Sequence, residues 1–517
     1  MLFRIDGSKS LGRQIYQSIR GAILSGELRE GSRLPATRAL MRDLNVSRNT
    51  VLSAYTQLLA EGYVVGRVGS GTYVTPELPD PTLRSMAAGR AKPATTVSAV
   101  RLSAYGQRLQ DESIAPLWTL GQSHGLLYDF RYGVPAVEEF PHELWRRLLM
   151  RRVRGASIRS LEYGPQEGYG PLREAIADYV HRVRGVVCEP EQVLVVNGAQ
   201  QALDLAARVL LEPGDRVVIE EPHYPGARRV FLAAGARLVT VPVDSEGLNA
   251  DVLPLTARSA RIAYVTPSHQ FPSGVILSLK RRLALLAWAQ ANGTFVFEDD
   301  FDSEYRYGGR PVEALQGLDQ SALVIYVGTF SKVLSPAFRL AYFVLPEQLV
   351  RPFRVAKWLA DRHTPTLWQE VLTDFIREGH LERHIRRSRV RNAARRAALL
   401  EAVEHHLRGY VELTGANAGE HLVAWLRGVK PGELDELIRR AARAGVGVYP
   451  IAPYYLEPPP RAGLLLGYSS MREADIDAGI RRLANVIVEW TRARKTTRLR
   501  GTSGSVIEPA SSNESAS

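Results

Sequence analysis

The chain has 517 residues, of which 45% are hydrophobic and 23% charged, with a formal charge of +12 at pH 7. This length exceeds one ordinary domain, and the composition is that of a globular protein rather than a disordered or fibrous one. No apolar run reaches the roughly 18 residues that span a bilayer, the start lacks a signal-peptide pattern, and one cysteine, Cys188, excludes an intramolecular disulfide or a cysteine metal cluster. The sequence predicts a cytoplasmic protein with no membrane partner, whose positive charge allows an acidic one.

Residues 9–77 are predicted to form a small unit of three helices and a hairpin. The first helix is predicted by apolar residues that recur about once per turn: Leu11, Ile15, Ile19 and Ile23. Gly26 ends this helix. Pro35 and Thr37 predict the start of a second helix with Thr37 as its cap, and the glycines within residues 63–74 predict a β-wing after a third helix.

The turn before the third predicted helix indicates what this unit binds. Asn45 and Val46 form a tight turn, and Ser47 is expected to cap a helix that runs to about Glu61. The buried side of that helix is expected to carry Val51, Tyr55, Leu58 and Leu59. Two helices joined in this way are typical of a helix-turn-helix, which presents the start of its second helix to the DNA major groove, here Ser47, Arg48, Asn49 and Thr50. A small helical domain that binds protein is the alternative.

The continuous stretch from residue 34 to residue 74 reads LPATRALMRDLNVSRNTVLSAYTQLLAEGYVVGRVGSGTYV, which resembles the winged helix-turn-helix of GntR-type bacterial transcription regulators. The resemblance implies double-stranded operator or promoter DNA as a partner. It also implies that Arg38 and Arg48 contact phosphates or bases, with Arg67 and Gly69 of the wing near the minor groove. Where some relatives carry a further contacting arginine, this chain has Leu52, so their base preference does not transfer.

Beyond this unit the composition and hydrophobic pattern of the sequence change twice. Residues 78–120 are rich in Pro, Ala, Ser and Thr and are predicted to form a linker. Residues 121–495 are predicted to form an α/β domain on a largely parallel sheet, because short β-branched runs alternate with helical stretches. The predicted strands are Val193–Asn197, Arg216–Glu220, Arg261–Thr266, Thr294–Glu298, Leu323–Val327 and Ala341–Leu345. Residues 496–517 are polar and are predicted to be a disordered tail.

A lysine directly after one of these strands is the first candidate for chemistry. Lys332 is either a surface residue at a strand end or a desolvated amine suited to Schiff-base formation. Its neighbours favour the second interpretation, since Thr329 and Ser331 offer hydroxyls and Arg339 offers a planar cation suited to phosphate. Residues 198–200, Gly-Ala-Gln, join a strand to a helix whose first amides offer a second phosphate anchor.

Two further side chains fit an aromatic cofactor with a ring nitrogen. Asp299 lies at the carboxyl end of a predicted strand, where such folds place ligands, and its carboxylate can hold a protonated pyridine nitrogen. The alternative is one acid in the solvated acidic run 298–304. Tyr224 can stack on a ring or simply pack in a turn.

Together these segments resemble the fold-type I aminotransferases, in motifs that occur in the family's order: YGPQEGYGPLREAIADYV, NGAQQALDL, EEPHYPGAR, TPSHQFPSG, EDDFDSEYRY and GTFSKVLSPAFRLAYFVLP. The resemblance implies pyridoxal 5'-phosphate as cofactor, with Lys332 as its Schiff-base lysine, Asp299 on the pyridine nitrogen and Tyr224 stacked on the ring. It places His269 and Gln270 near the phenolic oxygen of the cofactor. It implies five residues that hold the phosphate, Ala199, Gln200, Thr329, Ser331 and Arg339.

Departures from the family pattern bear on turnover. Phe301 stands where relatives usually carry a tyrosine that bonds the phenolic oxygen. The stretch 463–469 lacks the arginine that normally binds a substrate carboxylate, and Arg461 is the nearest candidate. Cofactor binding survives these departures better than turnover does.

Seven arginines within 383–396 form either a second DNA-contacting face or a solvated helix.

A GntR-type winged helix followed by a fold-type I aminotransferase-like domain, with a large parallel or mixed sheet and a small C-terminal α+β lobe, resembles the MocR subgroup of bacterial regulators. The resemblance implies a head-to-tail homodimer in which an amine, an amino acid or pyridoxal phosphate itself controls DNA binding. Two alternatives stay open. In one the domain is a genuine aminotransferase that also regulates, and in the other the cofactor is permanent and a partner protein is the signal.

Overall fold

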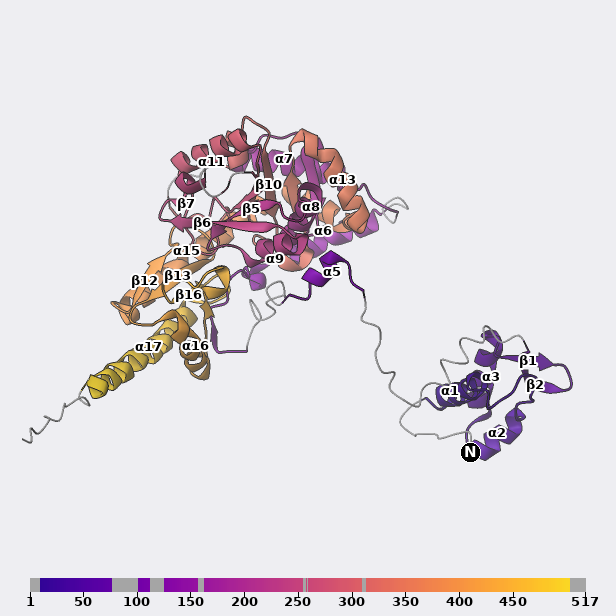
Figure 1. The fold of residues 1–517 in the computed structure, drawn as a ribbon. Helices are drawn as coiled ribbons and strands as arrows, with labels where there is room; N and C mark the ends of the chain where they lie inside the picture. Colours follow the sequence, from indigo (N-terminus) through magenta and orange to yellow (C-terminus); the bar gives the residue numbers. More distant parts are fainter. Residues whose placement is uncertain are drawn as a thin grey trace, which may run out of the picture. The chain divides into compact units, whose positions relative to one another are not determined.

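The computed structural model describes residues 10–76, 101–111, 125–156, 162–253, 257, 259–308 and 313–502. The chain forms two compact units, Met1–Arg101 and Leu102–Ser517 (Figure 1). Within the described residues, no helix is both long enough and apolar enough to cross a membrane.

The N-terminal unit is a three-helix domain with an antiparallel hairpin. Its elements are α1 (Leu11–Leu24), α2 (Thr37–Leu44), α3 (Arg48–Ala60), β1 (Val64–Arg67) and β2 (Gly71–Val74). A single core joins them, and it includes Ile15, Ile19, Leu40, Val51 and Leu58. The winged helix-turn-helix order predicted from the sequence is therefore the observed one.

Caps and turns explain where the helices of this unit begin. Asn45 adopts the left-handed conformation (φ 51°) between α2 and α3, and the Ser47 hydroxyl accepts a hydrogen bond from the Thr50 amide at 3.2 Å. Two details of the sequence prediction were wrong. The cap position of α2 is Ala36, one residue before the predicted cap Thr37, and Leu59 is 42% exposed because it points away from the core.

The larger unit is built on an eight-stranded sheet in the order β4-β11-β10-β9-β8-β5-β6-β7. Strands β6, β5, β8, β9 and β10 pair in parallel, whereas β11 runs antiparallel to both β10 and β4, so the sheet is mixed. The strands are β4 (Val193–Val196), β5 (Arg216–Glu221), β6 (Arg237–Asp244), β7 (Gly247–Leu248), β8 (Ala260–Val265), β9 (Phe295–Asp300), β10 (Val324–Thr329) and β11 (Ala341–Val344).

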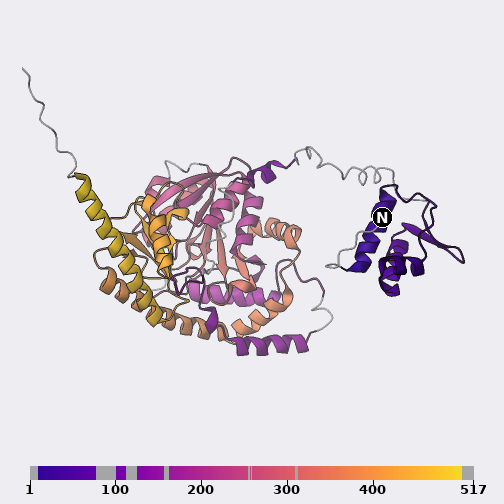
Figure 2. The ribbon, with the colours of Figure 1, turned by 90° about the horizontal axis from the view of Figure 1, so that it is seen from below.

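Helices cover both faces of this sheet (Figures 1 and 2). They are α6 (His142–Arg154), α7 (Gly170–Arg184), α8 (Ala199–Leu210), α9 (Pro225–Ala234), α11 (Leu279–Asn292), α12 (Leu315–Leu318), α13 (Glu347–Asp361) and α14 (Thr366–Arg377). Alternate strand residues face opposite cores: Leu194 and Val196 pack with α8, α9 and α13, while Val193 and Val195 pack with α6, α7 and α14. Burial on both faces explains why the strands are apolar runs rather than alternating patterns.

The C-terminal lobe is an antiparallel sheet covered by long helices. Its sheet has the order β12-β13-β16-β15, and a short parallel pair, β3 with β14, lies beside it. The elements are β3 (Tyr128–Asp129), α15 (His380–Leu407), β12 (Val411–Thr414), β13 (His421–Leu426), α16 (Leu434–Arg443), β14 (Val446–Gly447), β15 (Tyr449–Pro450), β16 (Gly463–Gly467) and α17 (Glu473–Thr502). Helix α17 continues past residue 495, where the sequence predicts a disordered tail, and residues 503–517 lie outside the described residues.

Part of the segment predicted as a linker is folded onto the larger unit. Helix α5 (Ala104–Arg108) is capped by the Ser103 hydroxyl, which accepts from the Gly106 amide at 3.1 Å. Arg108 Nε donates to the Ala233 carbonyl of α9 at 2.8 Å. Tyr105 of this helix and Leu109 just after it also line the main cavity of the unit. Helix α5, within the predicted linker, is thus an element of the larger unit.

Candidate functional site

A cavity of about 1010 Å³ lies at the carboxyl ends of β8, β9 and β10, with the C-terminal lobe forming part of its wall. Eight of the ten residues predicted for the cofactor line it: Ala199, Gln200, Tyr224, Asp299, Thr329, Ser331, Lys332 and Arg339. Parallel strands end at the same edge of a sheet, so side chains distant in sequence meet there.

Lys332 presents its amine to this cavity from the turn after β10. Its Nζ donates to the Gly133 carbonyl at 2.6 Å, and a Cβ on Gly133 would lie 3.2 Å from that nitrogen. Phe330 and Val333 on either side are buried, which fixes the turn. Within the described residues no carboxylate lies within ion-pair distance of Nζ, so the amine is held by a neutral acceptor and is not tied into a strong ion pair.

Asp299 offers one free carboxylate oxygen at the floor of the cavity. Tyr264 donates its hydroxyl to Oδ2 at 2.8 Å, while Oδ1 is buried without a hydrogen-bond partner among the described residues. Burial raises the pKa of Asp299 to about 6, against the lowering effect of the Tyr264 hydrogen bond. A buried acceptor with no donor is costly. A protonated ring nitrogen would satisfy it.

At the opposite end, backbone and cationic groups form a cradle for an anion. Gly198 has φ 89°, and a Cβ there would lie 2.7 Å from Arg339 Nη2, so no side chain fits between them. Arg339 donates to the Asn197 carbonyl at 3.0 Å, and the first amides of α8, at Ala199 and Gln200, point out of the helix N-terminus. The Ser331 amide donates to the Thr329 hydroxyl at 3.1 Å. These donors fit a phosphate dianion.

The two remaining residues predicted for the cofactor do not line the cavity. His269 is buried with Nδ1 2.8 Å from Asp302 Oδ2, and its Nε2 has no partner among the described residues. The Gln270 amide donates to the Pro222 and Phe271 carbonyls, both at 2.7 Å. Gln270 therefore fixes the loop, whereas Asp302 and Phe271 reach the cavity wall.

Several wall residues are not singled out by the sequence analysis. Tyr264, Asp302, His421 and Glu420 come from different strands and loops, and only the fold brings them beside Lys332. Burial lowers the pKa of His421 to about 3, and its Nε2 lies 2.9 Å from the Pro272 carbonyl. An acid before an apolar strand, in the stretch GEHLVAWL, was the one hint available for Glu420.

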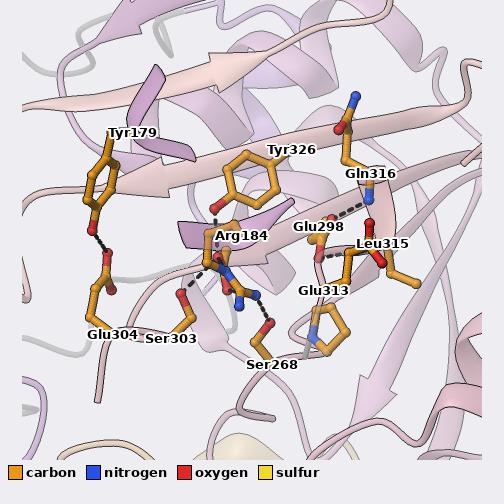
Figure 3. Close-up of polar contacts among 12 residues, drawn as sticks. Tyr179, Arg184, Ser268, Glu298, Ser303, Glu304, Glu313, Leu315, Gln316 and Tyr326 are labelled. Carbon is orange, nitrogen blue, oxygen red and sulfur yellow. Dashed lines mark hydrogen bonds and ion pairs between the residues drawn. The ribbon is translucent and has the colours of Figure 1, made fainter. Parts of the chain in front are cut away.

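A buried polar network supports the floor of the site (Figure 3). Arg184 Nε donates to Asp300 Oδ2 at 2.7 Å and its Nη2 donates to the Ser268 hydroxyl at 2.6 Å. The Tyr326 hydroxyl donates to Asp300 at 2.6 Å, and Glu298 accepts from the amides of Leu315 and Gln316. Asp299 is thereby flanked by two fixed acids, and Ser268 precedes His269.

The departures from the aminotransferase pattern are visible in the cavity. Phe301 lines the wall. Arg461 donates to Glu412 at 2.8 Å and does not line the cavity. Besides Arg339, the arginine on the wall is Arg229 of α9, whose buried Nε has no partner among the described residues.

The residues predicted to contact DNA lie on the surface of the N-terminal unit. Arg38, Ser47, Arg48 and Asn49 are exposed and Thr50 is half-buried. The Arg67 guanidinium lies 4.8 Å from the centre of the Tyr73 ring, and Gly69 has φ 75° at the tip of the hairpin, next to the fully exposed Val68. The residues predicted to contact DNA therefore lie at the start of α2, at the start of α3 and on the hairpin, all within the N-terminal unit.

Many of the arginines in 383–396 are engaged within the larger unit. Arg391 and Arg395 pair with Glu139, Arg396 donates to the Ala416 carbonyl, and Arg389 donates to the Glu304 carbonyl at 2.9 Å. These contacts favour a structural helix over a second DNA-contacting face.

The chain is similar to known proteins along most of its length. Residues 11–74 match the model of "Bacterial regulatory proteins, gntR family", and residues 136–483 match "Aminotransferase class I and II". The probable rhizopine catabolism regulatory protein MocR of Rhizobium meliloti is 38% identical, over 93% of this chain and 95% of that protein. The HTH-type transcriptional regulator TauR of Rhodobacter capsulatus is 33% identical, over 93% and 97%. Among solved structures, the α-aminoadipate aminotransferase LysN of Thermus thermophilus, complexed with N-(5'-phosphopyridoxyl)-L-leucine, has 33% identity and a TM-score of 0.67, covering 75% of this chain and 97% of its own.

Proposed function

The chain belongs to the MocR subgroup of GntR-type transcription regulators, and on this premise we propose that it senses a primary amine at Lys332 and changes its DNA binding in response. It binds DNA through its winged helix and pyridoxal phosphate through its aminotransferase-like unit. The observation that carries the proposal is one cavity lined both by a lysine amine that is bound only to a backbone carbonyl among the described residues and by Asp299 with its unpartnered oxygen.

Different side chains of the cavity would bind different parts of pyridoxal phosphate. When bound, the cofactor supplies an electrophilic aldehyde carbon and an electron-withdrawing ring. Asp299 Oδ1 would accept a hydrogen bond from the protonated ring nitrogen, while Tyr264 keeps the other oxygen in place. Arg339 and the amides of Ala199 and Gln200 would hold the phosphate, with the hydroxyls of Thr329 and Ser331. Tyr224 would cover one face of the ring.

Helix α9 provides a physical route from the cofactor to the linker. Tyr224 occupies the cap position at its start, and the carbonyl of Ala233 near its end holds Arg108 of α5. A ligand that shifts Tyr224 therefore acts on the helix to which α5 is attached. To act in this way, the ligand must bind the protein more tightly in one position of α5 than in another. A ligand that binds both conformations equally does not shift the equilibrium between them.

A homodimer is part of the proposal. On α13, Val355, Trp358 and Leu359 are 49%, 44% and 70% exposed, which gives one helix a cluster of large apolar side chains open to solvent. Such a cluster is typical of a protein interface. Two winged helices in one dimer would read two DNA half-sites.

Genuine transaminase turnover is the second candidate, favoured by the similarity to LysN. The wall argues against it, since Phe301 offers no hydroxyl and Arg461 is bound to Glu412 outside the cavity. Steady-state formation of a keto acid from an amino donor would establish it.

The cofactor roles are tested by absorption. Wild-type protein loaded with pyridoxal phosphate is expected to be yellow, and to change colour when an amine displaces the lysine. Lys332→Arg is expected to abolish the yellow band, because a guanidinium does not form a Schiff base. A wild-type protein that takes up no pyridoxal phosphate would overturn the assignment.

A further inference from the structure

Glu420 is a buried acid on the cavity wall, and the proposed function assigns no role to it. It precedes β13, is 3% exposed, and lines the same cavity as Lys332. Its Oε1 has no hydrogen-bond partner among the described residues. Polar groups buried in this way are ordinarily satisfied, so the free oxygen needs an explanation.

Backbone contacts on both sides of Glu420 hold this part of the chain in place. The Tyr468 amide donates to the Glu420 carbonyl at 3.1 Å and the Gly419 amide donates to the Tyr305 carbonyl at 2.7 Å. A Cβ on Gly419 would lie 1.9 Å from His269 Cε1, so the chain passes directly against that ring. These contacts therefore fix the backbone of Glu420 at the cavity wall.

The other acids beside it already have partners. Asp302 is bonded to His269, and Asp299 is bonded to Tyr264 with its free oxygen placed for the ring nitrogen. Burial raises the pKa of Glu420 to about 8, and the charges of Asp302 and Glu304 add to the rise, while the Lys332 amine and the Ser469 hydroxyl lower it. A carboxyl group in this state is neutral in the free protein near pH 7. A cation brought next to it would make it ionise and pair.

Arg229 on α9 is the competing recognition group, because it can bind a ligand carboxylate. The titratable groups that interact with Arg229 are the hydroxyls of Tyr224 and Tyr454, whereas Glu420 interacts with Lys332 itself. The group next to the reacting amine is thus an acid, which offers no cationic partner to a ligand carboxylate.

We propose that the amine recognised at Lys332 carries a second cationic nitrogen in place of a carboxylate, and that Glu420 pairs with this nitrogen. The inference rests on the proposed function and specifies its ligand class as diamines. The pairing is a charge-assisted hydrogen bond from the ammonium group to Oε1, with no covalent step at Glu420.

The test compares two ligands of equal chain length, 1,4-diaminobutane and 4-aminobutanoate, on wild-type protein loaded with pyridoxal phosphate. Absorption titration is expected to give the diamine the higher affinity, by roughly tenfold or more. Glu420→Gln is expected to remove most of that preference while keeping the yellow colour. Glu401→Gln, an exposed glutamate on α15, is the matched control and should keep it.

Equal or tighter binding of 4-aminobutanoate, weakened by Arg229→Gln, would overturn the inference and leave the proposed function intact. Because the ligand comparison uses wild-type protein, it tests the preference for a diamine even if Glu420→Gln does not fold. A yellow protein whose spectrum responds to no amine would instead overturn the proposed function, and with it this inference.

Discussion

Replacing Arg184 by methionine removes the central donor of the network under the site. The side chain of Arg184 is 8% exposed and that of Asp300 is 1% exposed, and the two are joined at 2.7 Å. Methionine fills similar space without a charge. In Arg184→Met, the donors left to Asp300 among the described residues are the hydroxyls of Tyr326 and Ser303, at 2.6 and 2.9 Å.

Leaving one partner of a buried ion pair uncompensated costs about 3–5 kcal/mol of unfolding free energy. Burial alone would raise the pKa of Asp300, but Arg184 outweighs it and the pKa lies below its ordinary value of 3.8. A depressed pKa stabilises the fold above pH 3.8, and this contribution is lost as pH falls further. The loss in Arg184→Met is therefore expected in full at neutral pH and is expected to shrink in acid.

Urea unfolding followed by tryptophan fluorescence measures this loss in the larger unit, because all seven tryptophans lie between residues 118 and 490. Arg182→Met is the matched control. Its arginine pairs with Glu382 at 2.9 Å, with side chains 57% and 27% exposed, so about 1 kcal/mol or less is expected. Equal losses in the two variants would refute the reasoning.

Three further predictions follow from the same contacts. Arg48→Ala should weaken a specific DNA site, chosen by selection from random sequences, by ~1–3 kcal/mol; unchanged affinity in a gel-shift assay would mean that α3 does not read bases. In cofactor-free protein, the raised pKa of Glu420 gives stability that is present below pH 4.5 and lost as pH rises through about 8; the melting temperature of Glu420→Gln should fall less across this range than that of wild type, and equal slopes would contradict the burial argument. Arg108→Ala should leave pyridoxal phosphate binding intact and reduce the effect of an amine on DNA affinity, because the bond to Ala233 is lost; a full response would exclude α5 as the connection.

The sequence predicted well what local patterns determine. The helix stripe of Ile15 and Ile19, the Ser47 cap and the apolar strands each follow from period, cap chemistry or burial on two faces. The α/β class, the winged helix and the pyridoxal phosphate cofactor were confirmed. The cap of α2 was missed because a threonine at a helix start also serves as its first residue.

What the sequence could not give depends on the tertiary fold. Glu420 lines the same cavity as Lys332 because the C-terminal lobe forms part of its wall, and Asp302 does so because β9 and β10 end at the same edge of the sheet. The motif around Gln270 predicts a cofactor contact, yet the Gln270 amide donates to backbone carbonyls of the loop. Helix α5 has one turn and no long apolar stripe, so its docking on α9 left no periodic signal.

The central claim is that chemistry at Lys332 controls DNA binding. DNA affinity should be measured on the selected site with and without the amine that changes the absorption spectrum most, in wild-type protein and in Lys332→Ala. The account predicts that the amine changes the affinity of wild type and leaves that of Lys332→Ala unchanged. The same change in both proteins, or in neither, would contradict it.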